Sequence, residues 1–124
     1  MSRRSAASRR RAERAGRVAE WIAAFVFIVQ GFSILARRYK TPLGEIDLIA
    51  KRGRLLVFAE VKARKRLETA LEAVGDADAR RISDAASLFL AKRPDLAHSD
   101  MRYDILAVAR FRLAHVKDAW REFE

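Results

Sequence analysis

The feature that most constrains the fold is the stretch of residues 44–64, GEIDLIAKRGRLLVFAEVKAR. Two apolar runs, residues 46–50 and 55–59, flank the basic tetrapeptide Lys-Arg-Gly-Arg, and a single acid interrupts the first run. Apolar segments on both sides of a glycine-containing turn are typical of an antiparallel β-hairpin. We therefore expect a β-sheet to form around this hairpin.

Charged side chains enter the hairpin from both strands. Side chains alternate between the two faces of a strand, so Asp47 is expected to share a face with Glu45 and Ile49. By the same rule Glu60 shares a face with Lys62 on the second strand. The charges are therefore expected to come in pairs.

The position of the turn decides how close the two acids come. If Arg52 and Gly53 form a two-residue turn, Asp47 faces Phe58 and lies diagonal to Glu60, about 7–8 Å away. Carboxylates at that separation can share a divalent cation, and Mg²⁺ favours one or two carboxylates with several waters kept. The spacing therefore predicts a metal site.

Lys62 can orient or deprotonate a water, or neutralise a phosphate, from the same face as Glu60. Together Asp47, Glu60 and Lys62 predict a catalytic site for phosphodiester cleavage. The alternative is that these charges form the solvated face of a hairpin. The apolar surroundings favour a site, because carboxylates there are costly to desolvate unless a cation or hydrogen-bond donors compensate.

Length and charge bound the remaining possibilities. With 124 residues and 51% hydrophobic content, the chain suits one compact domain, which we place at residues 16–124. Cysteine is absent, which excludes disulfides and thiolate metal sites and suits a reducing cytoplasm. The net charge of +10 favours a polyanionic partner, either nucleic acid or an anionic membrane surface.

The positive charge gathers in two places. Residues 1–17 hold seven arginines and one glutamate, and we expect residues 1–15 to be a disordered basic arm or a frayed start of the next helix. The second cluster surrounds the predicted site. Its candidate phosphate-binding residues, for which ordinary solvation of the hairpin is the alternative, are Lys51, Arg52, Arg54, Arg64, Lys65 and Arg66.

Residues 18–29, VAEWIAAFVFIV, are apolar nearly all round and predict a buried helix. A membrane anchor is the alternative. The run falls short of the roughly 20 residues a span needs, Glu20 opens it and Gln30-Gly31 interrupts it, so a membrane role is not favoured.

The rest of the chain completes an α/β pattern, α-β-β-β-α-β. Apolar residues recur with helical period from Leu71 to Phe89, and Gly75 weakens that helix without ending it. Asp78 falls on or near its inner side. The expected elements after residue 30 are a strand over 31–39, the two strands of the hairpin over 44–64, a helix over about 68–92, a strand over 101–108 and a short last strand over 111–116.

Several motifs together resemble the YraN-like family of bacterial proteins, uncharacterised protein family 0102. They are GEIDLIA, LVFAEVKAR, Gly16…Glu20…Ala23, Gly31-Phe32, Arg102-Tyr103-Asp104 and His115-Val116…Ala119-Trp120. The resemblance extends from about Gly16 to Trp120. It implies the PD-(D/E)xK fold of restriction endonucleases and Holliday-junction resolvases, with a mixed central sheet flanked by helices.

The resemblance also implies roles for single residues. Mg²⁺ or Mn²⁺ would be held by Asp47 and Glu60, with Glu20 and the Val61 carbonyl nearby, while Lys62 activates water. A surface glutamate near a helix start is the alternative for Glu20. Asp104 and His115 are expected to be structural.

Two positions depart from the family pattern. Asparagine is usual where Arg38 stands, and lysine is usual where Asp78 stands. Asp78 would repel phosphate or add a metal ligand, and the alternative is a helix acid paired with Arg81 or Arg80.

The resulting hypothesis is a metal-dependent endonuclease that acts on nucleic acid, DNA foremost, with branched or junction DNA as one substrate class. It needs no small-molecule cofactor, and a homodimer is compatible with it. The main alternative is a non-catalytic nucleic-acid-binding module of the same fold, which Asp78 favours.

Overall fold

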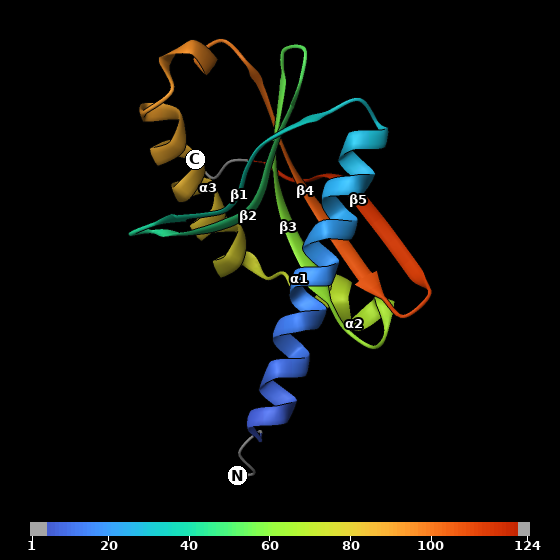
Figure 1. The fold of residues 1–124 in the computed structure, drawn as a ribbon. Coiled ribbons are helices and arrows are strands. Elements are labelled where there is room, and N and C mark those ends of the chain that lie inside the picture. The colour runs from blue at the N-terminus through green and yellow to red at the C-terminus, as the bar shows by residue number, and fades with distance from the viewer. Residues whose placement is uncertain (1–4, 122–124) are drawn as a thin grey trace.

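Figure 1 shows the computed structural model of the chain, which describes residues 5–121 apart from the side chain of Ala12. A single sheet carries helices on both sides. The elements in chain order are α1 (Ala6–Val29), β1 (Ser33–Thr41), β2 (Gly44–Arg52), β3 (Leu55–Ala63), α2 (Leu67–Glu72), α3 (Asp76–Ala91), a 3-10 turn (Pro94–Leu96), β4 (Asp100–Ala109) and β5 (Arg112–Trp120).

The five strands lie side by side in chain order. β1, β2 and β3 form an antiparallel meander, β4 runs parallel to β3, and β5 returns antiparallel to β4. A parallel pair requires a crossover, and α2 and α3 lie in it. The predicted α/β class, the mixed sheet and the element order are confirmed, and β5 is a full nine-residue strand rather than a short one.

Two apolar clusters hold the helices on opposite faces of the sheet. Phe27 of α1 packs in one cluster with Val57, and Phe89 of α3 packs in the other with Phe58. Because Val57 and Phe58 are neighbours on β3, their side chains leave the sheet on opposite faces. The predicted first core helix and the predicted helix on the sheet are thus both confirmed.

The basic N-terminal segment differs from the expected disordered arm. Residues 6–15 belong to α1, and the Ser5 side chain caps the helix by accepting a hydrogen bond of 3.1 Å from the Ser8 amide. Alanine, arginine and glutamate are strong helix formers, and the cap satisfies one of the free amides of the first turn. Residues 1–4 of the expected arm lie outside the described part of the chain.

The expected single helix over 68–92 is two helices. α2 ends at Glu72 and α3 begins at Asp76, with Gly75 as the N-cap residue of α3 in an extended conformation. The Asp78 carboxylate accepts a hydrogen bond of 3.2 Å from the Gly75 amide, which fixes the start of α3. The expected helix is therefore interrupted between Glu72 and Asp76, with Gly75 as the residue from which α3 starts.

The turn of the central hairpin lies one residue later than expected. Arg52 pairs with Leu55, so Gly53 and Arg54 form the turn, and Gly53 takes the positive φ of +57°. The last paired residues at the other end of this ladder are Leu48 and Ala59. Asp47 and Glu60 are the next residues on their strands, just beyond the ladder, and a hydrogen bond joins their side chains.

The expected alternation along β2 is interrupted at Asp47. Ile46 and Ile49 both pack in the cluster under α3, whereas Leu48 packs in the cluster under α1. On the neighbouring strand Arg38 has a φ of +52°, a conformation that asparagine adopts more readily than arginine. Asp47 lies at this irregularity and lines two hollows, and irregular strand positions are frequent near active sites.

Asp104 organises a buried polar network at the far edge of the sheet. It is 0% exposed and accepts hydrogen bonds from Arg102 at 2.8 Å and from the Asp118 amide at 3.0 Å. The Nε2 atom of His115 lies 2.7 Å from Oδ2 of Asp104. Burial by itself would raise the pKa of Asp104, but the bonds from His115, Arg102 and Asp118 lower it. The structural roles expected for Asp104 and His115 are confirmed.

Candidate active site

Asp47 and Glu60 bring two carboxyl groups together where β2 and β3 separate beyond their last pair. Asp47 Oδ2 accepts a hydrogen bond of 2.8 Å from the Val61 amide, which fixes its side chain against β3. The Glu60 side chain is only 12% exposed. The two predicted acids are therefore neighbours within one largely buried site.

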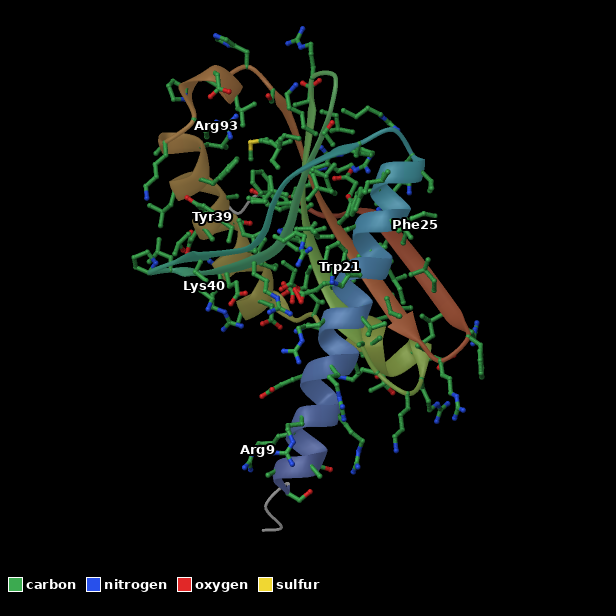
Figure 2. All side chains as sticks on the ribbon, in the orientation of Figure 1. Arg9, Trp21, Phe25, Tyr39, Lys40 and Arg93 are labelled. Carbon is green, nitrogen blue, oxygen red and sulfur yellow. The ribbon has the colours of Figure 1, made fainter. Side chains whose placement is uncertain are left out.

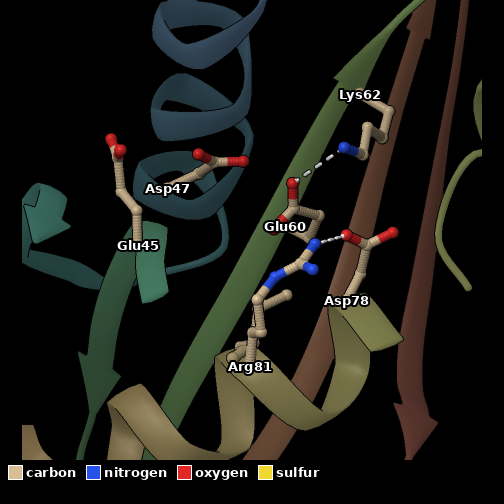
Figure 3. A pocket seen from close by; sticks show the side chains of 7 residues that line it. Glu45, Asp47, Glu60, Lys62, Asp78 and Arg81 are labelled. Atoms are coloured by element: carbon tan, nitrogen blue, oxygen red, sulfur yellow. Dashed lines mark hydrogen bonds and ion pairs between the residues drawn. The ribbon is translucent and has the colours of Figure 1, made fainter. Parts of the chain in front are cut away.

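Lys62 lies on the same side of β3 as Glu60, with its ammonium nitrogen 3.3 Å from Glu60 Oε1 (Figure 3). All three predicted catalytic residues line one pocket of about 280 Å³. The pocket is lined by Glu45, Asp47, Glu60, Lys62, Asp78, Arg81 and Ile82. The structure thus gathers residues from β2, β3 and α3 at one place.

The electrostatics of the acid pair differ from those of a surface carboxyl group. Burial, the charge of Asp47 and a hydrogen bond with Asp47 raise the pKa of Glu60 to about 8, although Lys62 opposes the shift. Burial also raises the pKa of Asp47, against the hydrogen bond from the Val61 amide. The pair therefore holds a proton near neutral pH, and a cation placed between the carboxyl groups would replace it.

Asp78 and Arg81 close one side of the pocket. Arg81 of α3, whose side chain is 59% exposed, forms an ion pair with Asp78 one turn earlier. Figure 3 shows the Arg81 side chain extending from α3 toward Glu60. Asp78 thus lines the pocket as a helix acid paired with Arg81, which confirms the alternative stated for it. The sequence did not single out Arg81 as a site residue, because its approach to Gly44 of β2 is a long-range contact.

A second hollow of about 280 Å³ adjoins the first and shares Glu45 and Asp47 with it. Its other lining residues are Gly16, Glu20, Arg38, Lys40 and Val61. Glu20 lies near Asp47, as the resemblance implied, and its negative charge contributes to the raised pKa of Asp47. α1 therefore supplies one wall of the site.

Glu20 is engaged by Arg38 rather than standing free. Arg38 Nε donates to both carboxylate oxygens at 2.8 and 2.9 Å, and the bond raises the pKa of Arg38. A cation could recruit Glu20 only if Arg38 released it. The sequence flagged Arg38 only as a departure from a pattern; the geometry identifies it as the partner that holds Glu20 next to Asp47.

The predicted phosphate-binding residues separate into two groups. Arg64, Lys65 and Arg66 directly follow β3 at the site end of that strand, where their side chains are exposed. The hairpin tip lies at the opposite end of β3, and Lys51 is about 13 Å along β2 from Asp47. The expectation that both groups surround the site is therefore corrected.

The three residues of the hairpin tip, Lys51, Arg52 and Arg54, contact other parts of the protein. The Arg52 guanidinium lies 4.5 Å from the Phe32 ring centroid. Each donates a hydrogen bond to a backbone carbonyl: Lys51 to Gly53, Arg52 to Gln30 and Arg54 to His98. These contacts tie the hairpin tip to neighbouring backbone, away from the site.

The N-terminal half of α1 extends beyond the rest of the fold in Figure 1. Four of the five arginines in this half precede Gly16, which lines the second hollow, and the fifth follows it. They are Arg9, Arg10, Arg11, Arg14 and Arg17. A projecting basic helix thus begins at the rim of the site. None of the helices within residues 5–121 is long and apolar enough to cross a membrane.

The donor set suits a hard divalent cation. Across the described chain, no three acidic or histidine side chains converge as a complete ligand set. Mg²⁺ does not require one, because it is commonly bound through one or two carboxylates and keeps several waters. Two adjoining buried carboxyl groups that compete for a proton, Asp47 and Glu60, fit that requirement.

Comparison with known proteins identifies the family. The model of uncharacterised protein family UPF0102 matches residues 19–108. A UPF0102 protein of Mesorhizobium japonicum is 47% identical over 121 residues, which cover 97% of each chain. One from Chelativorans sp. is 54% identical over 101 residues, 82% of each chain, and one from Rhizobium johnstonii is 47% identical over 92% of this chain and 94% of its own. The chain therefore belongs to protein family UPF0102.

Proposed function

We propose that this protein is a divalent-metal-dependent endonuclease that cleaves phosphodiester bonds in nucleic acid, with DNA as the expected substrate. One observation carries the proposal: Asp47 and Glu60 adjoin in a largely buried pocket, and the Lys62 ammonium lies 3.3 Å from Glu60. Carboxylates on neighbouring strands with a lysine beside them are the groups that metal-assisted phosphodiester hydrolysis requires. The endonuclease-like fold and a cytoplasmic location are parts of the same proposal.

Asp47 and Glu60 would hold Mg²⁺ or Mn²⁺. When bound, such an ion supplies charge stabilisation for a phosphate and a nucleophilic water at neutral pH. The Val61 amide orients Asp47, so that its carboxylate is preorganised before the ion arrives. Binding displaces the proton that the acid pair holds, which makes the affinity for the ion dependent on pH.

Lys62 acts next to the metal-binding carboxylates. Its ammonium is positioned to orient the attacking water and to stabilise negative charge on the phosphate. Glu60 holds the Lys62 side chain in the pocket, where a lysine charge is only partly screened by solvent. The role of Lys62 is therefore catalytic, whereas the role of the Val61 amide is positioning.

The substrate backbone would be held by cations around the pocket. Arg64, Lys65 and Arg66 continue from β3 directly after Lys62, and Arg81 reaches the pocket from α3. A chain with a net charge of +10 has the sign needed to bind a polyanion, and phosphate contacts of this kind are independent of base sequence.

The test is cleavage of labelled duplex, single-stranded, flap and junction DNAs, and of RNA, with Mg²⁺, Mn²⁺ or EDTA. We expect metal-dependent cleavage by the wild type and its loss in Asp47→Asn and Glu60→Gln. Asp76→Asn is the matched control, because Asp76 is an exposed acid in the first turn of α3 that does not line the pocket. Cleavage that survives either pocket substitution contradicts the proposal.

A non-catalytic nucleic-acid-binding module is the second candidate. The Asp78–Arg81 ion pair favours it, because Asp78 adds a negative charge to the pocket and engages the nearest arginine. This candidate predicts salt-sensitive binding in every lane of the same assay and cleavage in none.

A further inference from the structure

The outer side of α1 carries six large apolar side chains that the fold leaves partly or largely exposed. One of them, Trp21, has the Arg37 guanidinium 3.8 Å from its ring centroid. We call this set the outer stripe of α1. Its members are each more than a third exposed, with Trp21 at 61% and Phe25 at 64% (Figure 2). The outer stripe consists of Val18, Trp21, Ile22, Phe25, Ile28 and Val29.

The outer stripe lies opposite the buried side of the same helix. Ala23 and Phe27, which pack on the sheet, are 0% exposed, and they fall between the members of the outer stripe in sequence. The six side chains offer on the order of 600 Å² of apolar surface per copy. Contiguous apolar patches of that size are rare on monomeric proteins and mark interaction surfaces.

The spacing of the outer stripe matches helix pairing. Val18, Ile22, Phe25 and Val29 follow one another at intervals of four, three and four residues, which is the spacing of the two apolar positions of a heptad. Intervals of this kind keep one seam of a helix facing a partner helix. The seam covers residues 18–29, a little more than three helical turns.

The seam is self-complementary when two copies run antiparallel. Val18 of one copy then meets Val29 of the other, and Ile22 meets Phe25, about a two-fold axis between residues 23 and 24. This is an isologous interface, the commonest kind in homodimers. Two copies bury on the order of 1,200 Å² in total, at the lower end of specific interfaces.

The charge distribution selects the antiparallel arrangement. Residues 18–29 contain no basic residue, whereas Arg10, Arg11, Arg14 and Arg17 precede them on the same helix. A parallel pair would place these arginines side by side, where they repel one another. In the antiparallel pair the two basic halves extend from opposite ends of the seam.

We propose that this protein forms a symmetric homodimer through the outer stripe of α1, with the two helices antiparallel. The second copy is the occupant because the stripe is self-complementary in spacing and the antiparallel arrangement keeps the basic halves of the two helices apart. The interface is separate from the pocket that contains Asp47, so the proposal does not depend on the proposed function.

Sedimentation equilibrium of the full chain tests the association. We expect the wild type to reach twice the chain mass of 14.1 kDa with increasing concentration. Phe25→Asp should weaken dimerisation at least about 30-fold, as loss of a central aromatic anchor does. Phe111→Asp is the control: Phe111 is 93% exposed in the turn between β4 and β5, outside the stripe, and should leave the dimer unchanged. Unchanged circular dichroism separates lost pairing from lost folding.

Cysteine cross-linking tests the direction, since the chain has no cysteine of its own. A mixture of Val18→Cys and Val29→Cys proteins should form disulfide-linked heterodimers faster than either protein links to itself. Preferential self-linking at residue 18 contradicts the antiparallel arrangement. A wild type that stays monomeric overturns the proposal. A wild type that floats with phosphatidylserine vesicles only while Phe25 is intact also overturns it and assigns the stripe to a membrane surface.

Discussion

The carboxyl groups of Asp47 and Glu60 are immediate neighbours because the turn of their hairpin falls at Gly53 and Arg54. A turn one residue earlier would separate them by a diagonal of about 7–8 Å. Their closeness makes the acid pair the dominant electrostatic feature of the pocket. Only Lys62 and Arg81 supply positive charge among the residues that line this pocket.

The stability of the metal-free protein should fall as pH rises from about 4.5 to about 8. The pKa of Glu60 is higher in the folded state than its usual value of 4.5, so the folded state binds the proton more tightly and loses that advantage on ionisation. The loss is on the order of a few kcal/mol. Thermal melts across this range should show it, and Glu60→Gln should flatten the profile.

Added Mg²⁺ or Mn²⁺ should restore stability at the alkaline end of the same melts. The ion neutralises the acid pair, and ligands that bind only the folded state raise the free energy of unfolding. An equal effect of the ions on Glu60→Gln would show that they bind elsewhere.

Lys62→Met should reduce the cleavage rate about 100-fold or more while changing substrate affinity little. Methionine keeps the length of the side chain but removes the charge next to Glu60, and positioned acid–base groups contribute about this much. Single-turnover kinetics and fluorescence anisotropy measure the two effects. Lys92→Met serves as the control, because Lys92 is an exposed residue at the end of α3, outside the pocket.

Asp78→Lys should strengthen nucleic-acid binding and steepen its dependence on salt. It replaces a negative charge at the pocket by a positive one and releases Arg81. The substitution should also cost about 1 kcal/mol of stability, because Asp78 accepts the Gly75 amide in the first turn of α3. Binding titrations at several salt concentrations test this, with Asp76→Lys as the control for general charge.

Asp104→Ala should destabilise the fold by about 3–5 kcal/mol, the usual range for removing one partner from a buried ion pair. Arg102, His115 and the Asp118 amide would lose their common acceptor. The pKa of Asp104 is lowered in the folded state, so the ionised carboxylate stabilises the fold at pH values above its usual pKa. This stabilisation is lost as the pH falls from the usual pKa through the folded-state pKa. Urea denaturation measures the change, and the exposed Asp95→Ala should show little.

Two glycines should respond oppositely to alanine. Gly16→Ala should stabilise the protein by about 0.5–1 kcal/mol, because an added Cβ meets nothing within 4 Å and alanine favours the helix. Gly44→Ala should destabilise it by about 1–3 kcal/mol, because the Cβ would lie 3.1 Å from the Arg81 carbonyl oxygen. Denaturation midpoints distinguish the two, and a stabilised Gly44→Ala would contradict the close approach of β2 to α3.

Local patterns in the sequence determined much of this protein. The apolar runs of residues 44–64 specify a hairpin, the helical period from Leu71 to Phe89 specifies the face that packs on the sheet, and Asp104 is identifiable as structural. The identity of the three pocket residues also follows from the sequence. These features are local or periodic, so they can be predicted without knowing how distant segments meet.

The tertiary structure decided how the site is assembled. A one-residue change in the turn made Asp47 and Glu60 direct neighbours, and Arg38 took Glu20 as its partner across 18 residues. The break at Gly75 set where α3 begins, and with it the position of Arg81. The position of a turn and the packing of distant segments depend on the combined energy of many contacts. The spacing of apolar residues along the sequence shows only which face of a helix or strand is apolar. The sequence could therefore name the residues of the pocket but not their separation.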